Sequence, residues 1–207
     1  EGNIPHTGDA IAWMLDITAM PAGDETPLSE LPVCVADSGG VYFVPALTGV
    51  GAPWWDEQAR GVICGLSRGT RREHLVRAAF ESVAYQIADV IGILRQQPGF
   101  ALQGLMADGG PSRNDWLMQF QADLLGCPVW RSNTAELSAL GAALMAMRSL
   151  WGTTDRQLAA LLPQHDEFKP DMQRHRQLQE NYSAWRQAVQ RTLWRPQASS
   201  LMTGEQP

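Results

Sequence analysis

Apolar residues recur at steps of three and four positions between Leu75 and Leu94, the spacing that aligns side chains along one face of an α-helix. Thr70 and Glu73 have the spacing of a capping box, and the sequence PGF ends the pattern after about Gln97. One long helix over residues 70–97 is therefore predicted. Its apolar face must be covered by other elements, so this helix locates the core.

Short apolar runs on both sides of this helix predict β-strands, at residues 41–47, 61–67, 101–107 and 127–132. The first two runs are expected to lie side by side. Helices over residues 114–125 and 136–151 follow the third and fourth runs. Strand, helix, strand, helix with short connections predicts right-handed crossovers and a parallel portion of the sheet, which is typical of the α/β class.

The predicted elements at the two ends of the chain are mostly helical. They are a helix from Gly8 to about Asp16, a helix near residues 154–162, an extended segment at 167–170 and a terminal helix over 171–194. The helix at 136–151 carries a group of small residues, which predicts that it lies close against the sheet or another backbone: Ala139, Gly141, Ala142 and Ala143. Trp54 and Trp55, in a long loop, are expected to plug the end of the sheet.

Composition excludes several classes of function. The 207 residues carry a net charge of -6 with a single lysine, Lys169, and no basic stripe, which argues against a nucleic-acid partner and against a P-loop lysine. No window approaches the roughly 18 to 20 apolar residues of a membrane span, so no membrane partner and a cytoplasmic location are expected. Cysteines and histidines are scattered, so no metal site is predicted.

The stretch ADGGPSRND, residues 107–115, places Gly109 and Gly110 where a strand ends and a helix begins. Open α/β sheets bind ligands at this position, and glycine lets a ligand approach the backbone. Asn114 would offer a nucleotide both a donor and an acceptor. The alternative is a plain tight turn in which Ser112 caps the helix and Asn114 is solvated.

A longer stretch, GVICGLSRGTRREHLVRAAFE at residues 61–81, resembles the second signature of the FGGY carbohydrate kinases at every required position: Gly61, Ile63, Gly65, Leu66, His74, Leu75, Ala78, Ala79, Phe80 and Glu81. Further segments resemble, in order and at family spacing, the carboxyl-terminal half of glycerol kinases: GGVYFVPALTGVGAPWWDEQARG, ESVAYQIADV, ADGGPSRNDWLMQFQADLLGCPV and ELSALGAA. The chain is thus similar to the FGGY carboxyl-terminal domain, with glycerol kinase closest in pattern.

The resemblance implies an RNase H-like domain of the actin, hexokinase and Hsp70 ATPase type, with a mixed sheet flanked by helices. It also implies that ATP or ADP, with magnesium, binds beside the DGG turn. Gly8, Gly109, Gly110 and Asn114 are the expected nucleotide-binding residues. Ala12 stands where glycerol kinases often have a glutamine, which removes one polar contact.

The resemblance further implies a kinase that transfers the γ-phosphoryl group of ATP to a polyol or sugar hydroxyl, glycerol first. Residues 1–195 would form its nucleotide-binding domain and residues 196–207 a disordered tail. The sugar-binding amino-terminal domain and the aspartate base would lie upstream, so we expect no catalytic residue here and no activity from this chain alone. Glu81 and Asp108 are interpreted as a cap or an arginine partner. The full-length protein is expected to be a homo-oligomer.

Two other interpretations stay open at the level of sequence. The parent could be a non-catalytic nucleotide sensor or scaffold, since actin-like domains also act as switches. The domain could also have lost nucleotide binding, for which Ala12 is the hint. A parent without the aspartate base that keeps Gly110 and Asn114 would favour the sensor.

Overall fold

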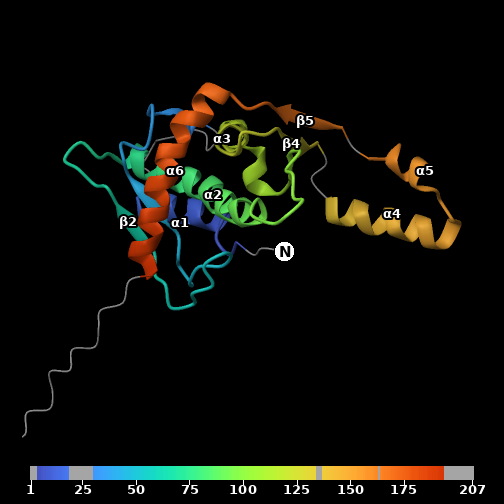
Figure 1. The fold of residues 1–207 in the computed structure, drawn as a ribbon, viewed down its shortest axis with the longest axis horizontal. Helices are drawn as coiled ribbons and strands as arrows, with labels where there is room; N and C mark the ends of the chain where they lie inside the picture. Colours follow the sequence, from blue (N-terminus) through green and yellow to red (C-terminus); the bar gives the residue numbers. More distant parts are fainter. Residues whose placement is uncertain (1–3, 19–29, 134–136, 163, 194–207) are drawn as a thin grey trace, which may run out of the picture.

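The computed structural model describes residues 4–18, 30–133, 137–162 and 164–193. Figure 1 shows their arrangement. The elements in chain order are α1 (Gly8–Ile17), the 3-10 turn η1 (Leu31–Val33), β1 (Tyr42–Val44), β2 (Val62–Cys64), α2 (Arg72–Leu94), β3 (Leu105–Ala107), the 3-10 turn η2 (Gly110–Arg113), α3 (Asp115–Leu125), β4 (Val129–Ser132), α4 (Leu137–Trp151), α5 (Asp155–Ala159), β5 (His165–Phe168) and α6 (Met172–Leu193). The predicted tail, residues 196–207, lies outside the described residues.

The strands form two small sheets. β1 and β2 pair antiparallel with Phe43 opposite Ile63, as expected for these neighbours. β3 and β4 pair parallel with Met106 opposite Trp130, which confirms the predicted parallel portion. β5 adds to β4 antiparallel, with Phe168 opposite Val129. The second sheet is therefore mixed.

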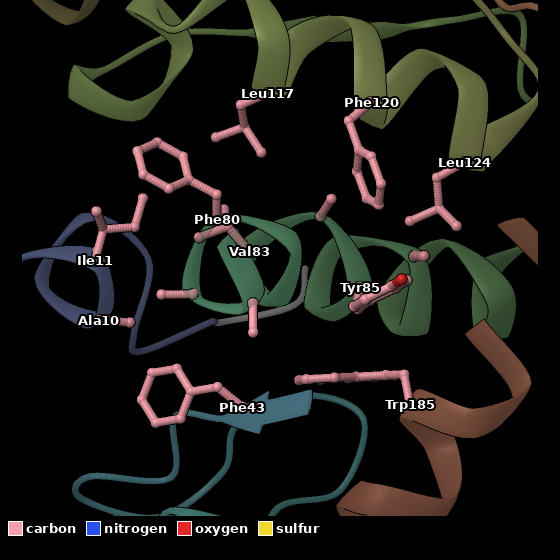
Figure 2. Packing of buried hydrophobic residues seen from close by; sticks show 14 of the residues in the cluster. Ala10, Ile11, Phe43, Phe80, Val83, Tyr85, Leu117, Phe120, Leu124 and Trp185 are labelled. Atoms are coloured by element: carbon pink, nitrogen blue, oxygen red, sulfur yellow. The ribbon is translucent and has the colours of Figure 1, made fainter. Parts of the chain in front are cut away.

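Helix α2 lies at the centre of the molecule, between α3 on one side and β1 with α6 on the other (Figures 1 and 2). Phe80, Val83 and Tyr85 of α2 are buried. Of the predicted apolar face only Ala79 and Val83 are buried, and Leu94 is exposed. Elements that surround α2 bury much of the rest of the helix instead, including its polar residues Arg77, Glu81 and Asp89.

The start of α2 differs from the prediction by one residue. The helix begins after Arg71, whose backbone N–H donates to Nδ1 of His74 over 2.9 Å. Thr70 instead uses its side-chain oxygen to accept the backbone N–H of Ser67, so it closes the preceding turn. The Thr70 and Glu73 capping box is therefore wrong, because His74 supplies the acceptor that a glutamate was expected to provide.

An ion pair is buried against the first half of α2. Nε of Arg77 donates to Oε1 of Glu81 over 2.8 Å, and both side chains are 5% exposed. The Arg77 guanidinium also donates to the carbonyls of Pro32, Val35 and Ala36 and lies 4.1 Å from the ring centre of Trp116. Arg77 thereby joins α2 to η1, to the segment after it and to α3. Burial raises the pKa of Glu81, although Arg77 opposes that shift.

A buried carboxylate joins α6 and the tryptophan loop to α2. Asp89 accepts hydrogen bonds from the Tyr182 hydroxyl at 2.7 Å and from the Trp185 indole at 2.9 Å. It also accepts one from the Trp54 indole at 3.3 Å. Trp54 is partly buried against the core, whereas Trp55 is 65% exposed, so the expectation that both tryptophans plug the end of the sheet is wrong for Trp55. Burial raises the pKa of Asp89 because three neutral donors only partly replace water.

Helices α4 and α5 extend away from this body (Figure 1). α4 packs mainly against α5, and none of its described residues is buried. An added Cβ at Gly141 would meet no atom within 4 Å. The expectation that the small residues bring this helix against the sheet is wrong within the described residues, where α4 packs mainly against α5. The alternative, close approach to another backbone, stays a prediction. No helix among the described residues is long and apolar enough to cross a membrane.

We predict that Asp89→Asn keeps the hydrogen bonds of Asp89 and removes its negative charge. The amide oxygen can accept from both indoles while the NH₂ group donates to the Tyr182 hydroxyl. Because the folded pKa is raised, folding favours the protonated carboxyl. The contribution of Asp89 to the free energy of unfolding therefore falls as pH rises from about 4, its ordinary value, through the folded pKa.

Urea unfolding across this pH range should show Asp89→Asn gaining stability relative to the native chain as pH rises. Asp89→Ala, which leaves the donors unpaired, should lose at least about 2 kcal/mol. Equal pH slopes for the native chain and Asp89→Asn would contradict this account.

Candidate functional site

The DGG turn joins the end of β3 to η2 through a conformation that only glycine adopts readily. Gly109 has φ 90° and ψ 178°. A Cβ added at Gly109 or Gly110 would meet no heavy atom within 4 Å, so the space in front of the turn is open. Backbone at the carboxyl end of a parallel strand is thus left accessible beside the start of α3, which favours a ligand at this place.

Two polar side chains hold the turn. The Ser112 hydroxyl donates to the Gly109 carbonyl over 2.7 Å, which closes η2. Asn114 is the residue that caps α3, since its Oδ1 accepts the Leu117 backbone N–H over 2.9 Å. The interpretation of Ser112 as the cap is therefore wrong. Asn114 is 7% exposed, so it is not a solvated first-turn residue.

Arg131 of β4 supports the turn from the side of the sheet. Its Nη1 donates to the Ser112 carbonyl at 3.1 Å and to Oδ1 of Asp115 at 2.6 Å. Its Nη2 donates to Oδ2 of Asp166 on β5 at 2.6 Å. The hydrogen bond to Asp166 raises the pKa of Arg131. One guanidinium thereby fixes η2 and the start of α3 against two strands.

An apolar cavity of about 480 Å³ lies between α1 and the turn. Ile11, Leu15 and Phe80 supply apolar walls, and Gly110 and Asn114 border it from the turn. Gly8 and Ala12 line it from α1. An added Cβ at Gly8 would come within 3.3 Å of Cγ of Pro111, so the glycine permits this close approach.

A second, polar cavity of about 460 Å³ lies on the other side of the turn. Its lining includes Gly109, Gly110, Arg113 and Arg131, together with the carboxylates Asp108, Asp115 and Asp166. The structure thus brings Gly8, Gly110 and Asn114 together around the apolar cavity. Gly109 lines only the polar one.

The residues present fit a nucleotide in shape and polarity. Ligand pockets of a few hundred cubic ångströms usually have apolar walls and few polar groups, as the cavity between α1 and the turn does. An aromatic base suits such walls, and the open glycine turn suits a phosphate group. The described residues hold no group of three His, Cys, Asp or Glu side chains that could hold a metal ion, whereas magnesium in nucleotide sites usually takes one or two carboxylates together with phosphate oxygens.

Sequence reasoning missed His6, which anchors the start of α1. Nδ1 of His6 lies 2.6 Å from Oδ2 of Asp9, and Nε2 accepts the Thr48 backbone N–H over 3.1 Å. The Gln86 amide of α2 donates to the His6 carbonyl over 2.9 Å. These contacts position Gly8 beside the turn. Because Thr48 and Gln86 are remote in the sequence, no local pattern signals them.

The two carboxylates noted in the sequence occupy different environments. Glu81 is an arginine partner, as interpreted, since its carboxylate pairs with Arg77 in the core. Asp108 is exposed and lines the polar cavity. Glu81 lines neither of the two cavities.

We predict that Gly109→Ala and Gly110→Ala differ in their effect on the free energy of unfolding, because only Gly109 has a backbone conformation that is strained for other residues. Gly109→Ala should lose about 1–3 kcal/mol of unfolding free energy, because a side chain must be forced into the glycine-only region. Gly110→Ala should change it by less than about 0.5 kcal/mol, since its Cβ enters empty space. Urea denaturation measures both values, and equal losses would contradict the assigned turn geometry.

Comparison with known proteins adds independent evidence. The sequence profile of the FGGY family of carbohydrate kinases, C-terminal domain, matches residues 1–150. The chain is 46% identical over 199 residues to apulose kinase of Pectobacterium atrosepticum, covering 96% of this chain and 40% of that protein. It is 45% identical over 195 residues to glycerol kinase 2 of Thermotoga maritima, covering 93% of this chain and 39% of that protein.

Solved structures agree on the fold. The crystal structure of Plasmodium falciparum glycerol kinase with ADP matches with a TM-score of 0.79 at 30% identity, over 93% of this chain and 38% of that one. The ligand-bound xylulose kinase of Lactobacillus acidophilus matches with a TM-score of 0.80 at 22% identity, over 92% and 39%. The expected RNase H-like, actin and hexokinase type of fold is confirmed.

The chain spans about 40% of the length of the curated relatives it matches. Sequence profile, relatives and fold agree, and this chain belongs to the FGGY family of carbohydrate kinases, matching its C-terminal domain.

Proposed function

We propose that this chain is the nucleotide-binding domain of an ATP-dependent carbohydrate kinase, with the nucleotide base in the apolar cavity between α1 and the DGG turn. The observation that carries the proposal is the convergence of Gly8, Gly110 and Asn114 on that cavity. The similarity to a glycerol kinase solved with ADP supports it.

Each part of the cavity has a role in this proposal. Ile11, Leu15 and Phe80 contact the base, and the absent side chains of Gly8 and Gly110 leave room for it. Asn114 holds α3 with Oδ1, and its amide group borders the ligand. Ala12 contributes wall area but no hydrogen bond, so recognition of the base depends on shape more than on polar contacts.

The proposed reaction transfers the γ-phosphoryl group of ATP to a hydroxyl of a sugar or polyol, with glycerol as the first candidate. Such transfer requires a base, charge neutralisation and an aligned acceptor, and magnesium bound with ATP supplies part of that neutralisation. We propose that the base and the acceptor pocket belong to an amino-terminal domain of the same kinase. The names of the relatives, apulose kinase and glycerol kinase, leave the acceptor open.

Helix α4 is the proposed contact with that amino-terminal domain. Met145, Leu150 and Trp151 are 64%, 75% and 73% exposed. Apolar side chains gathered on one helix usually mark a contact surface, and the small residues on α4 would let another backbone approach. The cytoplasmic location and the homo-oligomeric state of the full-length protein stay predictions.

We predict that the chain binds ADP in a calorimetric titration with magnesium, and that changes at the turn weaken binding. Gly110→Val fills the space above the turn, so it should raise Kd at least about tenfold. Asn114→Ser keeps a capping hydroxyl but lacks the amide, so it should also raise Kd while the helix stays intact. Asn114→Ala removes both the capping oxygen and the amide group.

Gly141→Val on exposed α4 is the matched control for Gly110→Val and should leave Kd unchanged. Saturable binding that Gly110→Val and Asn114→Ser leave untouched would place the nucleotide elsewhere. No binding by the native chain, under conditions where it unfolds cooperatively, would contradict the proposal for the isolated domain.

We also predict that the purified chain has no kinase activity alone. A coupled assay for ADP with glycerol or apulose as acceptor should give a rate equal to the acceptor-free rate, because we propose that the base and the acceptor pocket belong to the amino-terminal domain. Glycerol kinase 2 of Thermotoga maritima provides the positive control. Acceptor-dependent ADP formation by the chain alone would contradict the division of roles.

A further inference from the structure

Arg113, the last residue of η2, lies on the boundary between the two cavities. It lines both the apolar cavity and the polar one, as does Gly110. The two residues are three positions apart across the 3-10 turn. A ligand that fills the apolar cavity and extends over the turn would therefore pass the Arg113 side chain.

The two arginines that line the polar cavity differ in whether their positive charge is paired with carboxylates. The Arg131 guanidinium is committed to Asp115, Asp166 and the Ser112 carbonyl, so its charge is compensated. Arg113 is exposed, and the structure gives its guanidinium no hydrogen-bond or ion-pair partner among the described residues. Within this cavity, Arg113 is the cation that remains available to a ligand.

The same cavity would repel a polyanion without such a cation. Asp108 adds negative charge at its edge, and the carboxylates of Asp115 and Asp166 outnumber the one guanidinium that pairs with them. A phosphate chain placed over Gly110 needs compensation close by. Arginine is suited to this, because its planar group can donate two parallel hydrogen bonds to one phosphate.

We propose that Arg113 binds the phosphate groups of the nucleotide and thereby sets the preference of this site for ADP over adenosine. The inference rests on the proposed function, which puts the base in the apolar cavity. It adds that the nucleotide crosses the turn, so that its phosphates lie between the backbone of Gly110 and the guanidinium of Arg113.

The test compares ADP, AMP and adenosine by calorimetry on the native chain, Arg113→Met and Arg113→Lys. Arg113→Met should weaken ADP about tenfold or more and change adenosine less than about twofold, with AMP between. Arg113→Lys should restore part of the ADP affinity, since it keeps the charge but not the paired donors. The loss should shrink at high salt, where charge is screened.

Arg156→Met is the matched control, because Arg156 is an exposed arginine on α5 away from both cavities. It should leave all three affinities unchanged. Thermal unfolding of each variant checks that the fold is intact.

Two results would overturn the inference alone. An unchanged ADP affinity in Arg113→Met would show that the side chain does not reach the phosphates. An equal loss for ADP and adenosine would show that Arg113 stacks on the base or holds the turn. Absence of binding by the native chain to all three ligands would overturn the proposed function and this inference together.

Discussion

The Arg77 guanidinium is buried, and its hydrogen bonds join parts of the chain that are remote in sequence. It pairs with Glu81 one helical turn away, donates to the backbone carbonyls of the segment after η1 and stacks on Trp116 of α3. Removing one partner of such a pair leaves a buried charge without compensation, which typically costs about 3–5 kcal/mol. Together with the apolar contacts between α2 and α3, this contact holds α3, and therefore the turn that precedes it, in place against α2.

The geometry of the candidate nucleotide site depends on contacts between residues that are far apart in the sequence. Its apolar walls come from α1, α2 and η2, three elements that no short motif contains together. His6 fixes the start of α1 to the loop at Thr48 and to α2, while Arg131 fixes the turn to β4 and β5. The glycines supply only a backbone conformation and open space. For this reason the local sequence signal for the candidate site is weak, two glycines and one asparagine, while its walls come from residues in other elements.

Local chemistry made several features predictable from the sequence. The apolar spacing predicted α2, and the alternation of strands and helices predicted the parallel pair β3 and β4. The resemblance to FGGY kinases pointed to Gly8, Gly109, Gly110 and Asn114, of which all but Gly109 line one cavity, and their role in nucleotide binding stays a prediction. Contacts between distant residues were not predictable. No spacing indicates that Arg77 pairs inward or that Asp89 receives hydrogen bonds from Tyr182 and Trp185. The cap at Arg71 was missed because a histidine is the acceptor there. The prediction that α4 packs against the sheet was wrong because small residues indicate a close approach without identifying the partner.

The central claim is that the base of the nucleotide occupies the apolar cavity between α1 and the DGG turn. A crystal structure of the chain grown with ADP and magnesium would test it most directly. The account predicts density for the purine between Ile11 of α1 and Gly110 of η2, with the phosphates above the turn. Density for ADP at another surface, with this cavity empty or filled by side chains, would contradict it.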